Sequence, residues 1–147
     1  MSVSKIVVGV DGSGGGRHAL GWAASLASGL GAEVIVVLAY DPMTQLMGTA
    51  ERMDFDELRA DADAKVRGEW CEPLVAAGVA HRAMLVEGDE PHEVLIGAAT
   101  AEGADLIVIG NVGLTGWRDR IIGSVAARVL KHSPVPVTVV PQPRPAD

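Results

Sequence analysis

Short runs of β-branched and other apolar residues alternate with longer amphipathic segments, and this alternation constrains the fold more than any other feature of the chain. The short runs predict strands at residues 5–10, 33–40, 81–87, 105–109 and 137–140. The longer segments predict helices at residues 18–30, 54–77, 90–102 and 123–132, with a kink or break near Pro73 in the second. Chains that alternate in this way form an open parallel sheet with helices on both faces and right-handed crossovers. The predicted class is α/β.

The length, composition and charge of the chain limit its domain organisation and its possible partners. With 147 residues it is close to one average domain, so we expect a single domain over residues 1–147 with a frayed tail at 141–147. Hydrophobic residues make up 48% and charged residues 21%, a globular composition that excludes disorder. The formal net charge of −7 argues against nonspecific binding of nucleic acid, which needs a basic surface.

The sequence also predicts a soluble, cytoplasmic protein without membrane partners. No apolar run approaches the about 20 residues needed to span a bilayer. The first apolar run ends at Asp11 and is too short for the core of a signal peptide. The single cysteine, Cys71, excludes an internal disulfide and indicates a reducing compartment.

A glycine-rich segment, residues 9–16, begins at the end of the first predicted strand, and we expect residues 12–16 to form a turn. It contains Gly14-x-Gly16-x-x-Ala19, which formally fits the dinucleotide-binding fingerprint. We discount that match because Asp11 would repel a pyrophosphate and because a full dinucleotide fold has more strands. An acid that ends a buried strand can accept hydrogen bonds from ribose hydroxyls, and it can also cap the following helix. Both roles stay open for Asp11.

A second glycine-rich segment follows the fourth predicted strand. It reads Gly110-Asn111-Val112-Gly113, then nine residues, then Gly123-Ser124. Glycines let backbone N–H groups approach an anion closely, and the N-terminus of a helix that starts here would attract phosphate. The Ser124 hydroxyl would either donate a further hydrogen bond to the anion or cap the helix. The segment lacks the lysine of a P-loop, so that class of nucleotide hydrolase is excluded.

Enzymatic functions have little support in the residues. His92-Glu93 begins a zinc-protease pattern, but Ile96 stands where the second ligand should be. No G-x-S-x-G nucleophile motif occurs, and the four histidines are scattered singly. The sequence therefore predicts no catalytic residue and no metal site.

The spacing Gly110-x2-Gly113-x9-Gly123-Ser124 resembles the nucleotide motif of the universal stress protein family. The resemblance extends over nearly the whole chain. Residues 6–13 resemble the opening strand of that family, and residues 88–91 and 104–110 resemble its third helix and fourth strand. Residues 133–137 resemble its ending.

This resemblance implies an adenine nucleotide α-hydrolase-like, Rossmann-like sheet of strand order 3-2-1-4-5, with an adenine nucleotide between strands 1 and 4. The implied contact residues are Gly9, Val10, Asp11, Ala39, Ile109, Gly110, Gly113, Gly123, Ser124 and Val125. Asp11 would bond the ribose hydroxyls, and the backbone of Ala39 would read the adenine edge. The glycines of the second segment, with Ser124 and Val125, would hold ribose and phosphates.

The resemblance further implies a regulatory or sensor protein of the stress response that binds ATP, with or without Mg²⁺. Cyclic AMP is an alternative ligand, because Asn111-Val112 resembles the corresponding pair in a cyclic AMP-binding subset of the family. Slow ATP hydrolysis is an enzymatic alternative. A homodimer through the last strand, with Val137 and Val139, is also implied.

Overall fold

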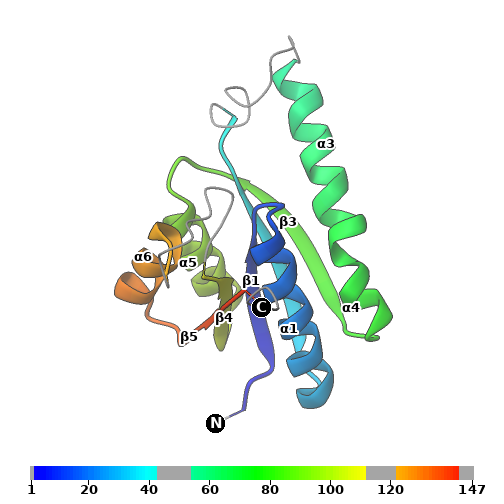
Figure 1. The fold of residues 1–147 in the computed structure, drawn as a ribbon, viewed down its shortest axis with the longest axis vertical. Helices are drawn as coiled ribbons and strands as arrows, with labels where there is room; N and C mark the ends of the chain where they lie inside the picture. Colours follow the sequence, from blue (N-terminus) through cyan, green and yellow to red (C-terminus); the bar gives the residue numbers. More distant parts are fainter. Residues whose placement is uncertain (1, 43–53, 112–121, 143–147) are drawn as a thin grey trace, which may run out of the picture.

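The computed structural model describes residues 2–42, 54–111 and 122–142. Within them, one parallel sheet forms the centre of the molecule, with its strands in the order β3-β2-β1-β4-β5 (Figure 1). The strands are β1 (Lys5–Val10), β2 (Glu33–Tyr40), β3 (His81–Glu87), β4 (Leu106–Gly110) and β5 (Val137–Val140). This topology confirms the predicted fold class and strand order.

Helices cover both faces of the sheet (Figure 1). One face carries α1 (Gly14–Leu30), α3 (Phe55–Arg67), the short 3-10 helix η1 (Glu69–Cys71) and α4 (Glu72–Ala76). The other carries α5 (Pro91–Glu102) and α6 (Ser124–His132). The first turns of α3 extend past the carboxyl ends of the strands in Figure 1. Among the described residues, no helix has both the length and the apolar character that crossing a membrane requires.

The hydrophobic core is divided by the sheet into two clusters. Alternate residues of β1 point to opposite faces, so Ile6 and Val8 pack with α1, whereas Val7 packs with α5 and α6. Each of these three side chains is fully buried. A sheet covered on both faces explains why its inner strands are continuously apolar rather than alternating.

The predicted strand boundaries are confirmed for β1, β2, β3 and β5, whereas β4 begins and ends one residue later than predicted. The predicted start of the first helix at residue 18 is wrong. Helix α1 begins at Gly14, because Ser13 is its N-cap and the Ser13 hydroxyl accepts a hydrogen bond from the Gly16 N–H at 3.1 Å. The glycines expected in a turn therefore form the first turn of the helix.

The prediction of one helix over residues 54–77 is also wrong. Its N-terminus is confirmed, with Asp54 as the N-cap, but α3 ends at Arg67. The break lies at Gly68, which adopts φ −106° and ψ −103°, and not at Pro73. Pro73 lies in the first turn of α4, where a proline has no helical hydrogen bond to lose.

Candidate functional site

The carboxyl ends of β1 and β4 lie side by side, although about a hundred residues separate them in sequence. The two strands pair in parallel, with Ile6 opposite Leu106 and Val8 opposite Val108. The chain leaves β1 toward α1 on one face and leaves β4 toward α6 on the other. In open α/β sheets, ligands bind at such a reversal of strand order, beyond the carboxyl ends of the strands.

The turn after β1 is organised by the Asp11 side chain. Its Oδ1 atom accepts a hydrogen bond from the Ser13 N–H at 2.9 Å. Between them Gly12 has φ +85°, a left-handed conformation that favours glycine. The interpretation of Asp11 as the helix cap is therefore corrected: Ser13 is the cap, and Asp11 shapes the turn that leads to it. The Asp11 side chain stays half-buried at the sheet edge.

The first turn of α1 packs directly on the end of β4. A Cβ atom on Gly110 would lie 2.9 Å from the Gly15 carbonyl oxygen and 3.5 Å from the Gly16 nitrogen. Only a glycine at this position lets the two backbones approach so closely. This contact brings the Asp11 turn and the second glycine-rich segment to one place.

Asn111 joins three elements at the same edge. Its N–H donates to the Val140 carbonyl at 3.1 Å, and its side-chain Oδ1 accepts from the Gln142 N–H at 3.1 Å. Its carbonyl oxygen accepts a hydrogen bond from the Gly123 N–H. In the sequence, Asn111 stands out only as part of a ligand motif. Its structural role depends on β5 and α6, which no local pattern places beside it.

The N-terminus of α6 faces this edge. Gly123 is the N-cap, with φ −80° and ψ 171°, and no side-chain hydrogen bond from the described residues caps the helix. The interpretation of Ser124 as the cap is therefore wrong: Ser124 is the first helical residue, and it is exposed. Unpaired N–H groups and the helix dipole together favour an anion at such an end.

The predicted contact residues differ in burial. Asp11, Ala39, Gly123 and Val125 are half-buried, Ser124 is exposed, and Gly9, Val10, Ile109 and Gly110 are buried. Gly113 lies outside the described residues. A Cβ on Gly9 would lie 2.8 Å from Leu95 Cδ1, so this glycine makes room for α5, as Gly110 does for α1.

Trp70 is a neighbour of this edge that the sequence did not predict. The position of a Cβ on Gly12 is 3.0 Å from Trp70 Cζ2, so the indole packs on the turn after Asp11. No sequence pattern signals this contact, because it joins two segments that lie far apart in the chain.

The described residues contain no group of three or more His, Cys, Asp or Glu side chains placed to hold a metal ion. The chemistry that the described residues offer at the edge is that of a carboxylate, backbone N–H groups and a hydroxyl. These groups bind sugar hydroxyls and anions by hydrogen bonding.

Comparisons with known proteins agree with this architecture. The model of the Universal stress protein family matches residues 2–141. A universal stress protein of Thermus aquaticus is 32% identical over 135 residues, which cover 92% of this chain and 96% of that protein. The solved structure of hypothetical protein MJ0577 superposes with a TM-score of 0.80 at 25% identity, over 99% of this chain and 100% of that one.

Two further solved structures contain an adenine nucleotide. A universal stress protein in complex with cAMP is 31% identical, with a TM-score of 0.73 and coverage of 95% of this chain and 98% of that one. The universal stress protein from Archaeoglobus fulgidus in complex with dAMP is 27% identical, with a TM-score of 0.66 and the same coverage, 95% and 98%. The family model spans nearly the whole chain, and the chain therefore belongs to the universal stress protein family.

Proposed function

We propose that this protein binds an adenine nucleotide at the carboxyl edge between β1 and β4 and acts as a regulatory or sensor protein in the stress response. One observation carries the proposal: the Asp11 turn, the end of β4 and the N-terminus of α6 meet at this edge. Relatives with bound cAMP and dAMP support the choice of an adenine nucleotide.

In this proposal each part of the edge takes one part of the ligand. The Asp11 carboxylate accepts hydrogen bonds from the ribose hydroxyls, and the Ala39 backbone reads the adenine edge. Gly9, Val10 and Ile109 border the base and sugar through their backbone, because their positions at the strand ends are buried. The N–H groups of Ser124 and Val125 bind phosphate, and Gly110, Gly113 and Gly123 let it approach.

We propose ATP as the first ligand and cyclic AMP as the second. The intact glycine motif supports ATP. Two observations favour cyclic AMP: a relative 31% identical was solved with it, and Asn111 brings no positive charge to the edge. A single helix N-terminus suits a single phosphate charge better than a triphosphate.

Any Mg²⁺ would be bound chiefly through the phosphates of ATP, because the described residues provide no ready group of acidic or histidine ligands. Slow hydrolysis of ATP is kept as the enzymatic alternative. We assign no general base to it, since this proposal gives the Asp11 carboxylate to the ribose hydroxyls, away from the phosphates.

We also propose a homodimer through β5, and the two edges of the sheet support this choice. At the β3 edge, Arg67 donates a hydrogen bond to the outward-facing Ala83 carbonyl at 3.0 Å, which blocks strand pairing there. At the other edge, two carbonyl oxygens face the β4 side. The Pro136 carbonyl, just before β5, accepts from the Ile107 N–H, and the Val140 carbonyl accepts from the Asn111 N–H. Because residues of a strand alternate, Val137 and Val139 direct their N–H and C=O groups away from β4.

The test is calorimetric titration of the full chain with ATP, with ATP and Mg²⁺, and with cyclic AMP, after mass spectrometry of natively purified protein for a retained nucleotide. We expect saturable binding of ATP, of cyclic AMP or of both. The ratio of the two dissociation constants decides which nucleotide is the preferred ligand. Absence of binding by both at millimolar concentration would overturn the proposed function.

A further inference from the structure

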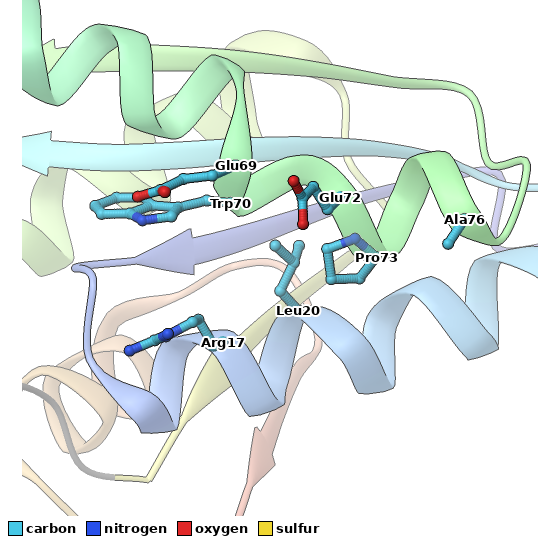
Figure 2. Close-up of a pocket in the computed structure, with 7 residues that line it drawn as sticks. All are labelled: Arg17, Leu20, Glu69, Trp70, Glu72, Pro73 and Ala76. Atoms are coloured by element: carbon cyan, nitrogen blue, oxygen red, sulfur yellow. The ribbon is translucent and has the colours of Figure 1, made fainter.

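A groove separates α1 from the segment formed by η1 and α4, on the face of the sheet that these helices cover (Figure 2). Its volume is about 520 Å³, within the range of sites that hold small molecules. Leu20 and Pro73 provide apolar lining from the two sides. The groove adjoins the carboxyl edge through Trp70, but its lining includes none of the proposed nucleotide contacts. The inference drawn from it therefore does not depend on nucleotide binding.

The two walls of the groove carry opposite charges. Figure 2 shows Arg17 on α1 and Glu69 and Glu72 on the facing segment. In the described part of the chain, none of these three side chains forms an ion pair or a hydrogen bond. Charged neighbours on α3 behave differently: Lys65 pairs with Asp61 at 3.1 Å, and Arg67 pairs with Asp63 at 2.9 Å.

An aromatic ring stands on the acidic wall. The indole of Trp70 is half-buried, and one of its edges packs on the turn at Gly12. It lines the groove, and in the sequence it stands between Glu69 and Glu72. The face of a tryptophan attracts ammonium and guanidinium groups, and flanking carboxylates strengthen that preference. The acidic wall is therefore suited to a cation with an apolar stem.

We propose that this groove binds a free cationic amino acid. Its guanidinium or ammonium group lies against Trp70, Glu69 and Glu72, its aliphatic stem lies over Leu20, and its carboxylate pairs with Arg17. A simple anion would meet two carboxylates, and a simple cation would leave Arg17 unpaired. A zwitterion with a cationic side chain pairs the charges of both walls at once.

The probe for the test is L-arginine, titrated into the full chain by calorimetry and followed by amide chemical shifts. Agmatine is the matched ligand, because it keeps the guanidinium and the stem but lacks the carboxylate. We expect saturable binding of arginine, with agmatine at least tenfold weaker. In Arg17→Gln this preference for arginine should disappear.

The double variant Glu69→Gln/Glu72→Gln should lose at least tenfold in affinity for both ligands. Glu57→Gln/Glu93→Gln is its control, since these exposed glutamates lie at the starts of α3 and α5 and the change in net charge is the same. Circular dichroism checks that each variant is folded. No saturable binding to the wild type, equal binding of arginine and agmatine, or an equal loss in the control would each overturn the proposal.

Discussion

The carbonyl oxygen of Gly15 lies 2.9 Å from the point that a Cβ atom on Gly110 would occupy. Both partners are backbone, in the first turn of α1 and at the end of β4, so neither can swing aside. A side chain at Gly110 must therefore push the helix away from the strand, and the Asp11 turn moves with it.

Gly110→Ala should lower the free energy of unfolding by about 1–3 kcal/mol, the usual cost of overpacking. Gly21→Ala is the control, because Gly21 lies within α1 with no atom within 4 Å of its Cβ position. That variant should gain about 0.5–1 kcal/mol. Urea denaturation measures both, and a neutral Gly110→Ala would show that the close backbone approach is not required.

Asp11→Asn should separate the two roles of Asp11. The amide oxygen of asparagine can still accept the Ser13 N–H, so the stability of the turn should be kept. Affinity for ribonucleotides should fall roughly tenfold, since a charged acceptor contributes about 1.5–3 kcal/mol. Affinity for 2′-deoxy analogues should fall less in parallel calorimetric titrations. Equal losses for both sugars would mean that Asp11 only shapes the turn.

Gly123→Val places a branched side chain at the N-cap of α6. The φ of −80° suits valine, so the fold should persist, with a stability loss of about 1 kcal/mol at the cap. Nucleotide affinity should fall at least roughly tenfold, because the side chain blocks phosphate from the N–H groups. Gly97→Val, at an exposed position of α5 where the Cβ position is open, should bind as the wild type does. Unchanged binding by Gly123→Val would remove α6 from the proposed site.

Val139→Pro tests the proposed dimer. It removes an N–H that points away from β4, so the β4–β5 hydrogen bonds should remain. Light scattering should give about twice the 15.2 kDa chain mass for the wild type and a shift toward monomer for the variant. Thr138→Pro, which removes a bond to β4, should instead destabilise the fold. A wild type that remains monomeric at high micromolar concentration would contradict the proposal.

Asp105 makes the stability of the fold depend on pH through its hydrogen bonds at the start of β1. Its Oδ2 atom accepts hydrogen bonds from the Ser4 N–H at 2.9 Å, the Ser4 hydroxyl at 3.1 Å and the Lys5 N–H at 3.1 Å. These hydrogen bonds lower the pKa of Asp105, and the bond from the Ser4 backbone N–H has the largest effect. The stabilisation is therefore present above the ordinary carboxyl pKa and is lost as the pH falls through the lowered value.

Asp105→Ala should accordingly be less stable than the wild type at neutral pH, and the difference should shrink in acid. Denaturant titrations at pH 7 and at successively lower pH measure it. A difference that stays constant with pH would mean that the carboxylate charge contributes nothing.

The sequence alone was sufficient to predict the class of fold and most strand boundaries. Apolar runs of strand length, separated by amphipathic segments, leave a parallel sheet as the way to bury both faces. The spacing of Gly110, Gly123 and Ser124 likewise indicates the family without reference to any tertiary contact. These signals are local, because each depends on residue types within one short segment.

Contacts between distant segments decided the rest. Glycines 14–16 form a helical turn rather than a loop because Ser13 caps them and Gly110 admits them against β4. The side chain of Asn111 accepts a hydrogen bond from Gln142, which follows β5. Trp70 and Arg17 line one groove although they lie in different helices. The sequence by itself determined the strands and the approximate places of the helices, since backbone preference and periodicity are local properties. Only the tertiary structure decided which side chains share a site, because close packing joins residues that no sequence spacing relates.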